Sequence, residues 1–66
     1  MILFNCVSQD SDATYPLGVP KACIGTVQVH QDQPEYSWIN FHCLKKGAQT
    51  RKVVGTVEEI VELVNS

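Results

Sequence analysis

The sequence predicts an α+β fold: a four-stranded, bent antiparallel sheet followed by one C-terminal helix, in the order ββββα. Residues 1–54 contain four runs in which side chains alternate between two faces, as they do in strands. Prolines, glycines and polar residues separate these runs. Residues 57–64 instead carry apolar side chains at helical spacing. The chain of 66 residues has the size of a single domain, residues 1–66.

The chain begins with the predicted first strand, Met1–Val7. Both of its faces are largely apolar, so we expect both to be covered, for example by a second subunit. The segment Ser8–Lys21 contains two prolines and a glycine and shows no sustained period, so we predict a long loop. Asp10 and Asp12 in this loop lack the glycine and distal glutamate of a calcium site, so we predict no metal there. Tyr15 either anchors the loop or belongs to a surface that binds a ligand or a partner.

A hairpin is predicted from the strands Ala22–His30 and Tyr36–Leu44, with a polar, proline-containing connector between them. If His30 pairs with Tyr36, counting outward predicts the pairs on one face. These pairs are Val29–Ser37, Val27–Ile39, Gly25–Phe41 and Cys23–Cys43. This face is apolar and should meet the helix. Gly25 either leaves room for the Phe41 ring or marks a β-bulge.

The other face of this hairpin gathers aromatic and polar side chains, and we call it the aromatic face. Its members are Gln28, His30, Tyr36, Trp38, Asn40 and His42. Rings with polar tips are enriched where a surface is covered by another molecule. Three interpretations remain open, namely packing on a second subunit, binding of a ligand or partner protein, and plain exposure to solvent.

The fourth predicted strand, Thr50–Val54, follows a glycine-containing turn. Gly55 then forms a corner, and Thr56 stands where a helix N-cap is expected. Glu59 lies three residues after Thr56, which is the spacing of a capping box. The predicted helix has one apolar stripe, formed by Val57, Ile60, Val61 and Val64 with Leu63 on its flank. Because so short a helix is marginal in water, it should form only by packing this stripe on the sheet.

Four of the five basic residues surround the turn before this last strand. They are Lys45, Lys46, Arg51 and Lys52. Such a cluster can bind the phosphate groups of a nucleotide or of RNA. It also fits an edge hairpin that its lysines keep solvated and unpaired, so both interpretations stay open.

The three cysteines, Cys6, Cys23 and Cys43, have no metal-ligand spacing, so we interpret them as small buried hydrophobic residues. A Cys23–Cys43 disulfide is geometrically possible in the predicted register. An odd cysteine count without a framework argues for a reducing compartment and against this bond. A cysteine on the core face could not reach a histidine on the opposite face, so we predict no catalytic pair and no enzyme activity.

Composition excludes several classes of partner. The net charge of -2 gives no overall attraction to nucleic acid or to acidic membranes. No apolar run approaches the length of a membrane span, and the start lacks the basic region of a signal peptide. We therefore expect a cytoplasmic protein without a cofactor. Because so short a chain buries little surface, we also expect a homo-oligomer.

The strand order and the stretch Val-Val-Gly-Thr-Val-Glu-Glu-Ile-Val-Glu-Leu-Val resemble the small FlbD-like proteins of flagellar operons, which have similar counterparts in phages. The similarity covers mainly residues 50–64, and Trp38 and the two histidines are not part of the pattern. The resemblance implies a small, non-enzymatic and oligomeric binding protein and favours a phage origin. Such a protein would bind and block a host protein or sequester a host signal molecule.

Three hypotheses for function follow. The first is a protein that binds and inhibits a host protein through the aromatic face together with the loop that contains Tyr15. The second is an oligomeric module that sequesters a nucleotide-like anion between subunits, with the basic cluster on the phosphates and Trp38 or Tyr36 stacked on the base. The third is a structural subunit whose aromatic face serves only self-assembly.

Overall fold

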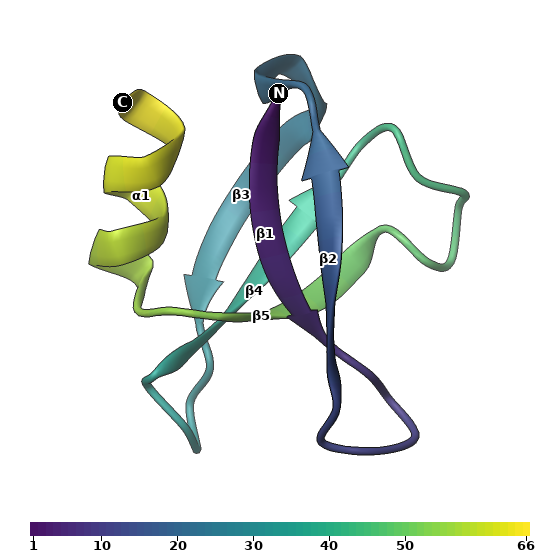
Figure 1. Ribbon diagram of the computed structural model, residues 1–66, viewed down its shortest axis with the longest axis vertical. Helices are drawn as coiled ribbons and strands as arrows, with labels where there is room; N and C mark the ends of the chain where they lie inside the picture. The colour runs from purple at the N-terminus through teal and green to yellow at the C-terminus, as the bar shows by residue number, and fades with distance from the viewer.

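The computed structural model describes residues 1–66 and contains five strands, a short 3₁₀ helix and one α-helix (Figure 1). The strands are β1 (Ile2–Val7), β2 (Thr14–Val19), β3 (Ile24–Val29), β4 (Tyr36–Phe41) and β5 (Thr50–Val54), and the helices are η1 (Lys21–Cys23) and α1 (Val57–Asn65). They form one antiparallel sheet in the order β2-β1-β5-β4-β3. The predicted α+β class with an antiparallel sheet and a C-terminal helix is confirmed, but the predicted number of strands is wrong.

The additional strand, β2, lies in the segment that was predicted to be a loop. The Ser8 N–H donates to the Ala13 carbonyl at 2.9 Å, and hydrogen-bonded pairs then alternate along the β1–β2 ladder. In this alternation the Asn5–Pro16 pair is one that exchanges no hydrogen bonds, so the backbone nitrogen of Pro16 points to the free edge of the sheet. Its missing N–H therefore removes no bond of the ladder, which is why an edge strand tolerates this proline. Two prolines, a glycine and the lack of a sustained period predict a loop here, and this prediction is wrong for Thr14–Val19 because Pro16 stands where the strand needs no N–H.

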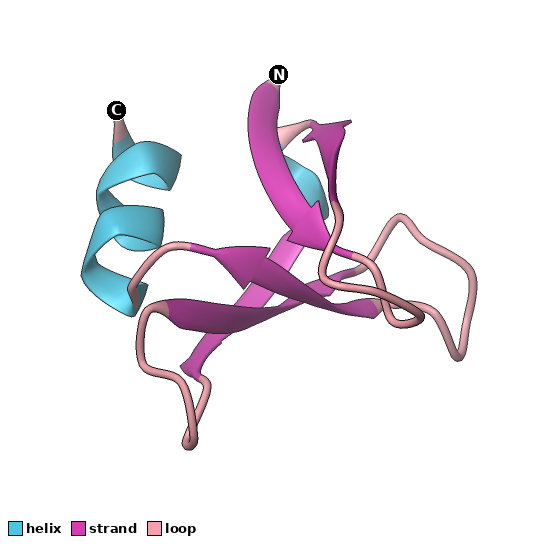
Figure 2. Cartoon of the chain, turned by 60° about the horizontal axis from the view of Figure 1, so that its bottom comes forward, coloured by secondary structure: helices cyan, strands magenta, loops and turns pink.

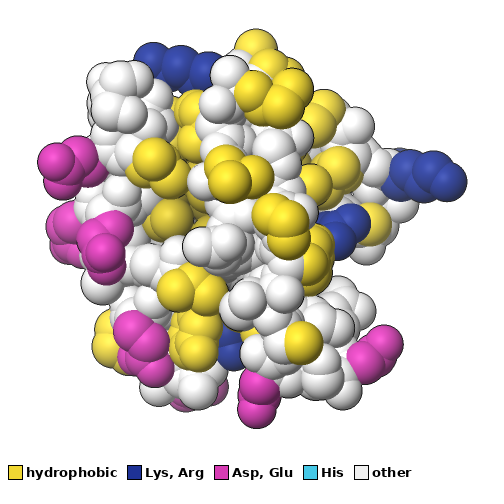
Figure 3. Space-filling view, viewed as in Figure 1, with side chains coloured by type: hydrophobic (Ala, Val, Ile, Leu, Met, Phe, Trp, Pro, Cys, Tyr) yellow, Lys and Arg dark blue, Asp and Glu magenta, His cyan; other side chains and the backbone are white.

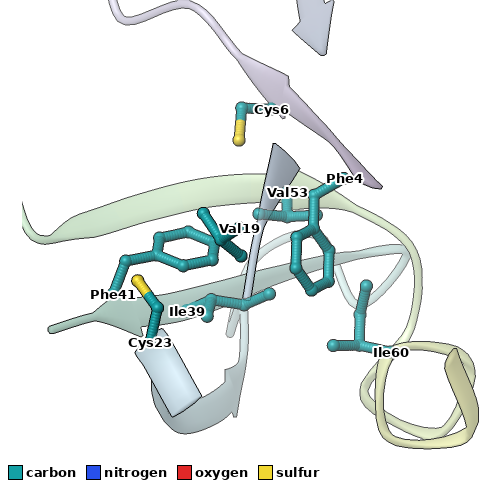
Figure 4. Packing of buried hydrophobic residues seen from close by; sticks show 8 residues of the cluster. All are labelled: Phe4, Cys6, Val19, Cys23, Ile39, Phe41, Val53 and Ile60. Atoms are coloured by element: carbon teal, nitrogen blue, oxygen red, sulfur yellow. The ribbon is translucent and has the colours of Figure 1, made fainter. Parts of the chain in front are cut away.

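The sheet bends over itself, with the β1–β2 hairpin lying across the other three strands (Figure 1). Figure 2 shows the strand at the N-terminus rising steeply from the strands below it. The core fills the space between these two parts (Figure 4) and consists of Phe4, Cys6, Val19, Cys23, Ile39, Phe41, Val53 and Ile60. Phe4 meets Phe41 edge to face, with 5.5 Å between the ring centroids. The predicted covering of both faces of β1 is not seen in the single chain, because Leu3 is 63% exposed.

Helix α1 begins with the predicted capping box. The Glu59 N–H donates to Thr56 Oγ1 at 3.2 Å, and the Thr56 N–H donates to Glu59 Oε1 at 3.1 Å. Gly55 before the cap has φ = 130°, a conformation that favours glycine. The Ser37 hydroxyl, which is buried, donates to the Gly55 carbonyl at 2.8 Å and so ties this corner to β4.

The apolar stripe of α1 packs against β3 and β4 but is only partly covered. Ile60 is buried, whereas Val61 and Leu63 are 43% and 41% exposed. Figure 3 shows apolar atoms on the surface between α1 and β1, and acidic side chains along the outer side of the helix. The helix of nine residues therefore covers one side of the core only in part.

The register of the β3–β4 hairpin confirms the predicted pairing of Val27 with Ile39 and of Val29 with Ser37. Beyond Val27 the register shifts, and Ile24 instead of Gly25 lies opposite Phe41. The bulge interpretation of Gly25 is therefore correct, and the interpretation that it makes room for the Phe41 ring is wrong. A Cβ at Gly25 would lie 2.5 Å from His42 Nε2, so this glycine accommodates the imidazole on the outer face.

The hairpin is also shorter at its open end than predicted. Residues 21–23 form η1, which includes Cys23, and β4 ends at Phe41. Cys23 and Cys43 form a disulfide with their Cα atoms 5.2 Å apart, joining η1 to the segment after β4. The expectation of three reduced cysteines is therefore wrong, and Cys6 is the one free thiol. Because disulfides are rare in reducing compartments, this bond weighs against the cytoplasmic location, which stays a prediction.

Candidate aromatic groove on the outer face of the sheet

The aromatic face lies on the side of the sheet that α1 does not cover. Ile39 in β4 is buried under the helix side, so its neighbour Trp38 points to the opposite face and is 36% exposed. The ladders place Gln28, Trp38 and Lys52 in one row across β3, β4 and β5. The tryptophan therefore stands in the middle of a solvent-facing sheet surface, between an amide and an ammonium group.

Trp38 is held in place by His30. The two rings stack with a centroid distance of 5.3 Å and an interplanar angle of 19°. The Gln33 N–H donates to His30 Nδ1 at 3.2 Å, so the backbone of the β3–β4 connector holds one side of the imidazole. One face of the indole is thus occupied by an imidazole that the β3–β4 connector orients, and the stack limits the rotamers that Trp38 can adopt.

Lys52 is engaged in a second set of contacts beside this stack. Its Nζ atom lies 4.4 Å from the Tyr36 ring centroid, within the range of a cation–π interaction. The same atom donates to Gln33 Oε1 at 2.8 Å. Gln33 therefore contacts both His30 and Lys52, and the connector links the side chains of β4 and β5 to His30, which follows β3.

An open groove of about 990 Å³ runs beside Trp38, and we call it the aromatic groove. Its walls come from the end of β1, the β1–β2 loop, the β4–β5 loop and the start of β5. The lining residues are Val7, Ser8, Gln9, Asp10, Ser11, Asp12, Tyr15, His30, Trp38, Gly47, Ala48, Thr50, Arg51 and Lys52. Because most of them are polar, the groove offers hydrogen-bonding groups around the rings of Tyr15, His30 and Trp38.

Arg51 organises the end of the groove near the β4–β5 loop. Its Nη1 atom donates to the Tyr15 hydroxyl at 2.7 Å, and its Nε atom donates to the Ala48 carbonyl at 2.9 Å. A guanidinium has five N–H donors, so three take no part in these two bonds. These two bonds join β5 to β2 and to the adjoining loop, which fixes the position of Tyr15 in the lining.

The β1–β2 loop forms part of the groove's wall, and its own serines shape it. Ser8 Oγ accepts from the Asp10 N–H at 3.4 Å, and Ser11 Oγ accepts from the Ala13 N–H at 3.3 Å. Asp10 and Asp12 are exposed and line the groove together with Arg51 and Lys52. No three His, Cys, Asp or Glu side chains are arranged to hold a metal ion.

Cys6 lies below this region, in the core. Burial raises the pKa of its thiol above the ordinary value of 9.0, and the nearby Arg51 charge and the Tyr15 hydroxyl offset only part of that rise. The thiol is therefore protonated at neutral pH. A buried, protonated cysteine is a poor nucleophile, so its chemistry fits a packing role.

The structure brings together only some of the residues proposed from the sequence. Trp38, His30, Tyr15, Arg51 and Lys52 line the groove. Tyr36 adjoins it through Lys52, and Gln28 lies next to Trp38 in the neighbouring strand.

Four other proposed residues lie outside the groove. Lys45 and Lys46 are exposed in the β4–β5 turn, and His42 is exposed over Gly25. Asn40 is half-buried, and its Oδ1 atom has no hydrogen-bond partner. The predicted basic cluster is thus divided between the groove and a solvated turn.

Sequence reasoning missed Gly47, Ala48 and Thr50 as parts of the lining. The only signal was their position next to Arg51 and Lys52, which gave no reason to bring them near Trp38. Comparison with protein-family models, with curated proteins and with solved structures found no match for this chain.

Proposed function

We propose that the protein is a non-enzymatic binding module that recognises a partner protein with the aromatic groove. The observation that carries this proposal is Trp38, partly exposed and stacked on His30 at the wall of an open groove of about 990 Å³. Tryptophan is the residue most enriched among the side chains that dominate binding energy in protein interfaces. A ring that is already ordered loses less conformational entropy when a partner covers it.

The composition of the groove favours a protein partner over an apolar small molecule. Small-molecule pockets are mostly apolar and enclose their ligand. This groove is open and has hydroxyls, carboxylates and basic groups around a single indole, which is the pattern of an aromatic anchor with a polar surround. The resemblance to FlbD-like proteins adds the proposal that the partner is a host protein and that binding inhibits it.

The test is capture of the partner from host extract by tagged wild-type protein, Trp38→Ala and Leu63→Ala. Leu63 on α1 is 41% exposed and lies outside the groove, so it is a matched control for loss of an exposed apolar side chain. The partner should be lost with Trp38→Ala, by at least tenfold in affinity, and retained with Leu63→Ala. Equal capture by the two variants would place the binding surface elsewhere.

A second candidate is the sequestration of a nucleotide-like anion, which the groove favours by placing Arg51 and Lys52 near Trp38 and His30. The basic groups would hold phosphates, and the free face of Trp38 would stack on the base. Thermal unfolding with AMP, a cyclic dinucleotide or ADP-ribose tests this candidate, since a ligand at 100 times its Kd adds about 2.7 kcal/mol of stability. If none of the three raises the Tm, this candidate fails and the protein partner remains.

A further inference from the structure

The two edges of the sheet are protected to different extents. β2 ends the sheet on one side, and there Pro16 removes an outward N–H. β3 ends it on the other side and has no proline and no charged side chain in its whole length, Ile24–Val29. Proline and charge are common devices that prevent an edge strand from pairing with another chain. β3 lacks both devices, and its bulge at Gly25, a third such device, lies before the regular edge Val27–Val29.

The backbone groups of β3 that face outward follow from one hydrogen bond. The His30 N–H donates to the Tyr36 carbonyl, which sets the alternation of the ladder. Gln28 therefore bonds to Trp38 in β4, whereas Val27 and Val29 turn their N–H and C=O groups to the free edge. None of the hydrogen bonds outside the ladders involves Val27 or Val29. Two donors and two acceptors thus lie along an open edge.

Helix α1 leaves part of this edge exposed. It packs against β3 and β4, with Ile60 buried in the core. Val29 remains 50% exposed although its side chain points to the inner face. The accessible surface of the chain, 4553 Å², also exceeds the roughly 4,200 Å² expected for a folded monomer of this mass. The exposed Val29 shows that some of this uncovered surface lies at the β3 edge.

We propose that two copies of the chain pair antiparallel through their β3 edges, about a twofold axis that passes beside Gln28. Val27 then lies opposite the partner's Val29, and Val29 lies opposite the partner's Val27. Each of these pairs exchanges two backbone hydrogen bonds, so four outward groups of each copy are satisfied at once. Because the same edge serves both copies, the contact is isologous and closes as a dimer.

The chemistry of the edge favours a second copy over another strand. The outward N–H and C=O groups of Val27 match the outward C=O and N–H groups of Val29 in a second copy, so the edge can pair with itself. No charged side chain of β3 meets its own copy across the axis, where like charges would repel. Gln28 meets the partner's Gln28, and two amides can donate to and accept from each other. The dimer thus forms one ten-stranded sheet from two sheets of five strands.

The dimer has a consequence for recognition that rests on the proposed function. Gln28 lies beside Trp38 on the outer face, and an axis perpendicular to the sheet keeps both outer faces on one side. The two Trp38 side chains are then separated by three strand spacings, about 14 Å. The dimer therefore presents two aromatic grooves to the same side.

Sedimentation equilibrium of the oxidised chain, from about 1 μM to about 1 mM, tests the pairing. The wild type should approach twice the chain mass of 7.3 kDa. Val29→Pro removes one outward donor from each copy without touching the ladder with β4, so the dimer should weaken at least tenfold, the factor that about 1.4 kcal/mol represents. Val29→Ala keeps the donor and should dimerise within about threefold of wild type, since β-propensity differences are small.

Charge at the axis gives a second test that does not change the backbone. Gln28→Lys and Gln28→Glu should each weaken the dimer, because like charges meet at the axis, and an equimolar mixture of the two should form a heterodimer. A wild type that stays monomeric would overturn the proposal, as would equal dimerisation of Val29→Pro and Val29→Ala or a mixture that does not associate. A monomeric wild type that still captures a partner through Trp38 would overturn the dimer alone, not the proposed function.

Discussion

Removing the disulfide should strongly destabilise the fold, because the bond closes a loop within a small domain. Cys23 and Cys43 are 20 residues apart, and chain-entropy reasoning then gives about 3 kcal/mol of stabilisation at 25 °C. Natural proteins have a free energy of unfolding of roughly 0.05–0.15 kcal/mol per residue, which gives about 3–10 kcal/mol for 66 residues. The double variant Cys23→Ala/Cys43→Ala should therefore lose a large fraction of its stability while keeping the β3–β4 and β1–β2 ladders.

Urea unfolding followed by circular dichroism measures this loss. With a slope of about 1 kcal/mol per molar, the midpoint of the double variant should fall by about 3 M relative to the oxidised wild type. Treating the wild type with dithiothreitol should cause a similar fall, and the double variant should be insensitive to the reductant. The loop-closure reasoning is refuted if the oxidised and reduced wild type unfold at the same urea concentration, or if dithiothreitol also shifts the double variant.

Three further predictions concern single residues. Thr56→Ala removes the side-chain acceptor of the capping box, so the free energy of unfolding should fall by about 1 kcal/mol in urea titration; no change would mean that the box does not hold α1. Gly25→Ala brings a Cβ against the His42 imidazole, so it should lower the Tm by several degrees, and the double change with His42→Ala should restore most of it; no rescue would contradict the contact. The raised pKa of Cys6 means that its thiol ionises at lower pH in the unfolded chain than in the folded one. The free energy of unfolding should therefore fall as pH rises above about 9.0, and it should fall less in Cys6→Ala. If the urea midpoints of the two proteins change equally between neutral and alkaline pH, the shift is contradicted.

The parts of the fold that depend on residues close together in the sequence could be predicted from it. The Thr56 cap, the corner at Gly55 and the Val27–Ile39 register each follow from local spacing, and the structure has all three. β2 was missed because the meaning of Pro16 depends on whether its nitrogen faces a neighbour or the free edge. Local sequence does not contain that information.

The disulfide and the groove were harder to predict from the sequence, each for its own reason. The predicted register already placed Cys23 across from Cys43, but an assumption about the redox compartment decided against the bond. The groove joins the β1–β2 loop to residues of β4 and β5, and this meeting depends on the bend of the whole sheet. The face that carries Trp38 could be predicted from alternation. The sequence supports joining the β1–β2 loop to that face only as a hypothesis, because local spacing does not determine how the sheet bends.

The measurement that addresses the recognition surface most directly is acrylamide quenching of Trp38, the only tryptophan in the chain. In the free protein the partly exposed indole should be quenched readily. In the complex with the captured partner, quenching should drop several-fold, because hot-spot side chains are shielded from solvent. Quenching that is the same in the free and bound states would show that the partner does not cover Trp38.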